Sequence, residues 1–75
     1  MKSINILLNT TDSVKNFVNI MSKYDYDMDI RSGRYVVDAK SILGIFSLDL
    51  NRPVTLELYA DDCDDILEDI KPFID

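Results

Sequence analysis

Histidine is absent from this 75-residue chain. The imidazole ring is the side chain that proteins most often use as a general base and as a metal ligand. The sequence also shows no nucleophile paired with a base and no glycine-rich phosphate loop. We therefore expect no enzyme activity, no catalytic residue, no metal site and no cofactor.

Cysteine, glycine and proline are also scarce. A single cysteine, Cys63, cannot form an internal disulfide, which indicates a reduced protein of the cytoplasm. Glycine and proline contribute two residues each, while 47% of the chain is hydrophobic. This composition is typical of a folded globular domain and not of a disordered chain.

The chain has neither a long apolar run nor an excess of positive charge. No run approaches the roughly 20 residues of a membrane-spanning helix, and no basic and apolar leader opens the sequence. Fourteen acidic residues against eight basic ones give a net charge of −6. Because this charge repels phosphate backbones and anionic lipids, we expect no direct nucleic-acid or membrane partner.

What the chain does have is a regular alternation of hydrophobic periods. A period of two residues predicts strands over residues 3–9, 25–30, 34–37 and 54–60, with Ser32-Gly33 as a tight turn. A period of 3.6 predicts helices from the capping residues 10–13 to about 24, over 42–50, and over 63–74, where Pro72 interrupts the last turn. This order predicts one α+β domain over residues 1–75, a two-layer sandwich in which helices cover one face of an antiparallel sheet.

Two groups of aspartates receive structural interpretations. Asp25, Asp27 and Asp29 are predicted to form a solvated strand face, which Arg31 and Arg34 balance.

A second group precedes the last helix and consists of Asp61, Asp62, Asp64 and Asp65. Its spacing lacks the glycine turn and terminal glutamate of a calcium loop, so we interpret it as the favourable acidic first turn of a helix. Cys63 between them is interpreted as a half-buried packing residue and not as a reactive thiol.

The helix predicted over residues 42–50 is apolar around most of its circumference. With Ser41 as its cap, its large apolar side chains cover an arc of about 220°. A helix lying on one sheet buries about half of such an arc. The rest is either covered by another element or remains exposed as a docking surface.

The same segment carries a family resemblance. The run from Ala39 to Leu48, with Lys-Ser-Ile followed by Leu-Gly-Ile-Phe-Ser-Leu, resembles the segment around the regulatory serine of HPr, the small phosphocarrier of the bacterial sugar phosphotransferase system. The resemblance extends more weakly from Lys2 to Ile74. It implies a βαββαβα open-faced sandwich with sheet order 1-4-2-3 and three helices on one face.

The resemblance fails where the family carries its phosphoryl group, on the histidine of a His-Ala-Arg-Pro motif. Counting back from Ser22-Lys23-Tyr24-Asp25 places Thr10 at the histidine position, Asp12 at the phosphate-binding arginine position and Ser13 at the proline position. Threonine is a poor nucleophile without an activating base, and Asp12 repels phosphate. Transfer from the family's donor, enzyme I, is therefore predicted to be lost.

The regulatory features of the family are retained. The resemblance implies that Ser41 is phosphorylated by HPr kinase/phosphorylase, with helix amides and Lys40 taking up the added charge. It also implies protein docking through Ile42, Leu43 and Phe46, with a catabolite-control transcription factor as one partner. A member without the acceptor histidine but with the regulatory serine is similar to Crh, the catabolite-repression homologue of HPr.

An alternative stays open. The chain would then be a diverged HPr-fold adaptor, or a homodimeric interaction protein, in which Ser41 serves only as a helix cap worth about 1 kcal/mol.

Overall fold

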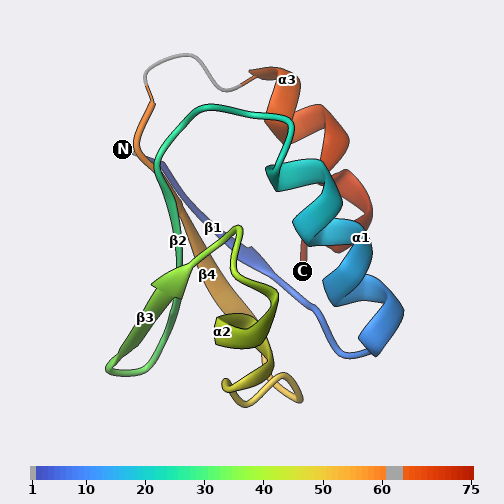
Figure 1. Cartoon of the computed structure of the whole chain (residues 1–75), viewed down its shortest axis with the longest axis vertical. Coiled ribbons are helices and arrows are strands. Elements are labelled where there is room, and N and C mark those ends of the chain that lie inside the picture. Colours follow the sequence, from blue (N-terminus) through green and yellow to red (C-terminus); the bar gives the residue numbers. More distant parts are fainter. Residues whose placement is uncertain (1, 61–63) are drawn as a thin grey trace.

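The computed structural model describes residues 2–60 and 64–75 (Figure 1). Asp61, Asp62 and Cys63 lie outside the described residues, so the interpretations given to them above stay predictions. In chain order the elements are β1 (Lys2–Ile6), α1 (Thr11–Met21), β2 (Met28–Ser32), β3 (Tyr35–Asp38), α2 (Ile42–Phe46), β4 (Val54–Leu58), α3 (Asp64–Asp69) and the 3₁₀ helix η1 (Lys71–Phe73).

The four strands form an antiparallel sheet in the order β1-β4-β2-β3. All three α-helices lie on one face of this sheet, and the other face is open (Figure 1). The predicted element order, sheet order and open-faced architecture are confirmed. Among the described residues, no helix is long and apolar enough to cross a membrane.

The core lies between the sheet and the helices because each strand turns its apolar side chains towards them. Ile6 of β1, Ile30 of β2 and Leu56 of β4 are fully buried beside the apolar stripe of α1. In that stripe Phe17 meets Phe73 of η1 edge to face, with ring centroids 5.7 Å apart. This contact fixes the end of the chain against α1 and closes the core on that side.

The β2–β3 hairpin turns through two residues, Gly33 and Arg34, between the paired Ser32 and Tyr35. Gly33 has a φ of 60°, which glycine adopts without the steric cost that other residues meet there. The sequence thus predicted the turn correctly, with its centre one residue later than expected.

The open face of the sheet carries an ion pair between a half-exposed arginine and a buried glutamate, which the sequence did not indicate. The Nε atom of Arg31 in β2 lies 2.5 Å from Oε1 of Glu57 in β4, and Glu57 is only 5% exposed. We expected the arginines to balance the aspartates of residues 25–29, but the closest partner of Arg31 lies on the neighbouring strand. The hydrogen bond to Glu57 is also the main cause that raises the pKa of Arg31.

Several predicted strands and helices extend beyond the elements that the structure shows. The first strand ends at Ile6 and not at residue 9, the first helix ends at Met21, and the second strand begins at Met28 because residues 22–27 form a turn and a loop. In that loop Tyr24 and Tyr26 stack, with ring centroids 5.8 Å apart. The apolar pattern at residue 26 therefore reflects side-chain packing and not strand pairing.

The central helix shows the largest correction, since it ends at Phe46 and not near Leu50. Ser47 closes it: its backbone N–H and its hydroxyl both donate to the carbonyl of Gly44. A second turn follows, in which Asp49 accepts a bond from the N–H of Asn51. Leu48 and Leu50 are half-buried against the core from this loop, so their apolar character did not require a helix.

Candidate functional site

The position expected for a phosphoryl acceptor lies at the start of α1, where Thr10 is the N-cap. Its Oγ1 accepts a hydrogen bond from the backbone N–H of Ser13 at 3.0 Å and donates one to the Ser13 hydroxyl at 2.7 Å. Both bonds hold the hydroxyl in the cap geometry. Neither partner is a base that could remove its proton, so the arrangement suits a helix cap better than a nucleophile.

A shallow hollow of about 510 Å³ borders the first turns of α1 and the end of the chain. Among the described residues, the carboxylates of Asp12, Asp69 and Asp75 line it, and no lysine or arginine does. A phosphate at this place would meet like charges, which disfavours it. The electrostatics of this end of the molecule are thus unsuited to holding a phosphoryl group.

Ser41 is the N-cap of α2, as the sequence predicted. Its Oγ accepts a bond from the N–H of Gly44 at 3.1 Å, and its own N–H donates to the carbonyl of Asp38 at 3.0 Å. Ser41 is half-buried and lies on the turn that leads out of β3.

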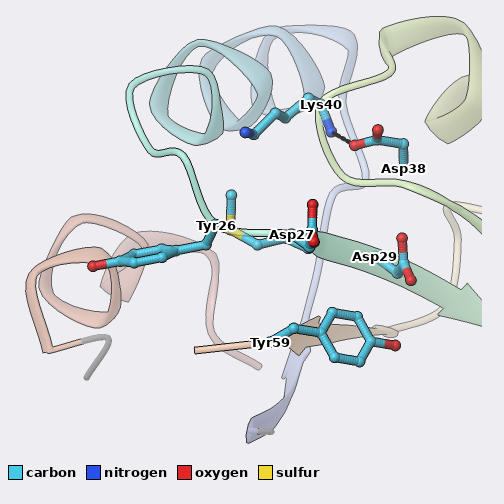
Figure 2. Close-up of a pocket in the computed structure, with 7 residues that line it drawn as sticks. Tyr26, Asp27, Asp29, Asp38, Lys40 and Tyr59 are labelled. Carbon is cyan, nitrogen blue, oxygen red and sulfur yellow. Dashed lines mark hydrogen bonds between the residues drawn. The ribbon is translucent and has the colours of Figure 1, made fainter. Parts of the chain in front are cut away.

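Lys40 does not point at Ser41. Its Nζ donates to the carbonyl of Tyr24 just beyond α1, at 2.6 Å, and Figure 2 shows the side chain running away from Asp38. Its backbone N–H donates to Oδ1 of Asp38 at 2.8 Å. The expected help from Lys40 for a phosphate on Ser41 therefore requires that the bond to Tyr24 break first.

Below this segment lies a hollow of about 490 Å³ that is rich in acidic and aromatic side chains (Figure 2). Asp27, Asp29 and Asp38 line it together with Tyr26 and Tyr59. In the described part of the chain, no three His, Cys, Asp or Glu side chains are placed so that they could hold a metal ion.

The expected docking residues lie on and around α2. Leu43 is 81% exposed and Phe46 is 40% exposed, so of the two outcomes left open for the apolar arc, exposure holds for Leu43 and in part for Phe46. Ile42 is half-buried, while Ile45 faces the core and is fully buried. Two large apolar side chains of one short helix thus face solvent next to the capped Ser41, which leaves a small apolar surface for contact.

A family model supplies the decisive comparison. Residues 12–75 match the model described as PTS HPr component phosphorylation site. The chain belongs to the HPr family. HPr proteins are phosphocarriers of the phosphotransferase system rather than catalysts, and they act together with other proteins of that system. The matched range begins at Asp12, two residues after Thr10.

Solved HPr structures share the whole fold. The chain is similar to HPr-C-His from Thermoanaerobacter tengcongensis, with a TM-score of 0.80 and 26% identity over 99% of this chain and 91% of that one. It is also similar to a phosphocarrier HPr from Bacillus anthracis, with a TM-score of 0.76 and 24% identity over 99% and 94% of the two chains.

A histidine-containing phosphocarrier protein of Mycoplasma gives a TM-score of 0.72 at 17% identity, over 95% of this chain and 86% of that one. The two likenesses below 25% identity bear on the fold alone. No curated protein sequence gave a significant match.

Two polar contacts between distant segments of the chain were not predicted from the sequence. One is the Arg31–Glu57 pair, which depends on the register between β2 and β4. The other joins the hydroxyl of Tyr24 to Asp69 of α3, 45 residues apart, and raises the pKa of Tyr24 to about 12. Both join residues distant in sequence, and only an alignment of paired changes could have signalled them.

Proposed function

We propose that this HPr-family chain is a non-enzymatic regulatory binding module of the cytoplasm that has lost the phosphocarrier reaction. The observation that supports the proposal is a pair of features at α1. Thr10, which sequence counting puts at the acceptor position, is held as a helix cap, and the described lining of the adjoining hollow has three carboxylates and no cation. A phosphoryl carrier needs a nucleophile and a cation that steadies the phosphate. Among the described residues, the Thr10 cap and the lining of this hollow provide neither.

Regulation in this proposal acts at Ser41, which HPr kinase/phosphorylase would phosphorylate. Ser41 is half-buried at the N-cap of α2, where backbone N–H groups of the first turn favour an added phosphate. The added charge would lie beside the exposed Leu43 and Phe46. A partner that combines an apolar groove with a basic rim, such as a catabolite-control transcription factor, would gain charge-assisted bonds of about 1.5–3 kcal/mol each.

A second candidate function is an adaptor that binds its partner without phosphorylation. The 81% exposure of Leu43 favours it, because the apolar surface exists before any charge is added to Ser41. The two functions differ in one measurable property. The regulatory module binds its partner only after Ser41 is modified, whereas the adaptor binds equally before and after.

The loss of carrier activity is tested with enzyme I and phosphoenolpyruvate. We expect no acid-labile phosphoryl group on this protein, while a histidine-containing HPr in the same reaction becomes labelled. The Thr10→His variant should remain almost unlabelled as well, because Asp12, Asp69 and Asp75 still line the adjoining hollow. Acid-labile labelling of the unmodified chain would contradict the proposal.

The docking surface is tested with the same protein after phosphorylation. Leu43→Ser should weaken binding to the transcription factor by about tenfold, the loss expected for one apolar side chain buried on binding. Because Leu43 is 81% exposed, this change should not unfold the chain. Val36→Ser on the opposite face of the sheet, also exposed, is the matched control and should leave binding unchanged.

A further inference from the structure

The outer edge of β3 is open in the part of the chain that the structure describes. β3 is the last strand of the sheet and pairs with β2 only (Figure 1). At the opposite margin the chain end partly closes β1, where the N–H of Leu7 donates to Phe73 and the N–H of Asp75 donates to Asn5. An open edge strand is a template for a further strand.

The hydrogen-bond alternation tells which backbone groups face that edge. Ser32 and Tyr35 flank the two-residue turn as a bonded pair, and the N–H of Ala39 donates to the carbonyl of Met28 at 3.0 Å. Bonded and non-bonded pairs alternate along an antiparallel ladder. Val37 is therefore bonded to β2, and the N–H and C=O of Val36 point away from it, towards the free edge.

The residues around Val36 are self-complementary. They read Arg34-Tyr35-Val36-Val37-Asp38, with opposite charges at the two ends and apolar side chains between them. Two copies paired antiparallel about Val36 would place Val36 opposite Val36, Tyr35 opposite Val37, and Arg34 opposite Asp38. A shift of one residue would set outward-facing backbone groups against groups already bonded to β2, so this register is favoured.

The exposure of these residues agrees with such a contact. Tyr35 is 67% exposed and Val36 is 45% exposed, both without a covering element among the described residues. Arg34 has no ion-pair partner in the described part of the chain, whereas Arg31 and Arg52 pair with Glu57 and Asp49. The contact would give Arg34 a carboxylate and would place opposite charges where two chains of net charge −6 meet.

We propose that the partner of this edge is a second copy of the chain, so that two sheets join through β3 into one continuous sheet. The contact is independent of Ser41 and of the apolar surface on α2. Because β3 has only four residues, the interface is small and the association is weak, as is typical of interfaces that bury less than about 1,200 Å².

The test exploits the two-fold pairing of Arg34 with Asp38. Sedimentation equilibrium and NMR diffusion over a concentration series should show a monomer–dimer equilibrium for the unmodified chain. Arg34→Asp and Asp38→Arg should each weaken it by about tenfold, because each creates two like-charge pairs. An equimolar mixture of the two variants should restore dimers, since every pair is then Arg with Asp or Asp with Arg.

Two further variants guard against a folding artefact. Val36→Pro removes only an N–H that faces the edge, so it should keep the fold and abolish the dimer. It also keeps the test valid if Asp38→Arg disturbs the turn, in which Asp38 accepts the N–H of Lys40. Leu43→Ala on α2 should leave the dimer unchanged.

The proposal is overturned if the unmodified chain stays monomeric throughout the series, if folded Val36→Pro still dimerises, or if the mixed variants fail to associate although both are folded. A dimer lost in Leu43→Ala would also overturn it, because the contact would then lie on α2.

Discussion

The hydroxyl of Ser41 accepts a hydrogen bond from Gly44 at 3.1 Å, and a Cβ atom added at residue 44 would lie 3.1 Å from that same oxygen. The added atom would also lie 3.2 Å from Cβ of Val37 in β3. Ser41 is held by its cap bond and Val37 by the sheet, so neither can move away freely. The missing side chain at residue 44 thus allows the cap of α2 to close against β3.

Gly44→Ala should therefore destabilise the chain although alanine is the better helix former. The gain in helix propensity is at most about 1 kcal/mol, while loss of the cap costs about 1 kcal/mol and crowding costs about 1–3 kcal/mol. We expect a net loss of about 1–3 kcal/mol in urea unfolding. An equally stable or more stable variant would show that the side chains of Ser41 and Val37 can shift to make room for the added methyl group.

The side chains that cap α1 and α2 should contribute equally to the free energy of unfolding. Ser41→Ala and Thr10→Ala each remove a side chain that accepts a backbone N–H, at 3.1 Å and 3.0 Å. Each should lower the free energy of unfolding by about 1 kcal/mol, and Ser3→Ala on the exposed face of β1 should change it little. A cap variant as stable as Ser3→Ala would refute the cap geometry described for that helix.

The Arg31–Glu57 pair should matter more than the Arg52–Asp49 pair. Glu57 is 5% exposed, so Arg31→Gln leaves a nearly buried carboxylate without its guanidinium partner. Arg52 and Asp49 are both largely exposed and 3.9 Å apart, a geometry that contributes little. Thermal unfolding should show the larger decrease in melting temperature for Arg31→Gln. Equal decreases would show that the Arg31–Glu57 pair contributes no more than the exposed pair.

Alkaline conditions should weaken the contact between the loop after α1, which carries Tyr24, and α3, which carries Asp69. The hydrogen bond to Asp69, assisted by burial and by nearby carboxylates, raises the pKa of Tyr24 from 10.0 to about 12. A group whose pKa is raised on folding contributes stability that is complete below its unfolded pKa and disappears as the pH passes its folded pKa. This contribution should therefore be present at pH 8 and fall between about pH 10 and 12.

Tyr24→Phe is the variant that isolates this effect. Its stability relative to the unmodified chain should be lower at pH 8, and the difference should shrink towards pH 12. A tyrosinate absorbance titration should also lose its component near pH 12. If Tyr24→Phe titrates like the unmodified chain, the high pKa belongs to another tyrosine.

The sequence predicted the fold well because each strand and helix shows a single apolar face of the right period. Phe17 and Met21 on one stripe, and Ile30 and Leu56 in alternating runs, are all buried as expected. It failed for the length of α2, since Leu48 is apolar for packing reasons and lies in a loop. An apolar residue indicates burial and not a helix, because a leucine in a loop can be buried as well as one in a helix.

In the candidate sites, features set by local sequence were predicted and features set by tertiary packing were not. The capping position of Ser41 follows from local chemistry and was predicted correctly. The direction of Lys40 towards Tyr24 was not, because it depends on how α1 ends beside the segment that leads to α2. The acidic hollow beside Asp12 also escaped prediction, since Asp69 and Asp75 reach it only through the packing of the chain end.

The central claim, that a module without carrier chemistry is controlled through Ser41, is tested most directly by intact-mass spectrometry after incubation with HPr kinase and ATP. We predict that the unmodified chain gains the mass of one phosphoryl group and that Ser41→Ala gains none, with fragment spectra placing the group on Ser41. Equal absence of modification in both proteins would contradict the regulatory account and leave Ser41 as the cap of α2.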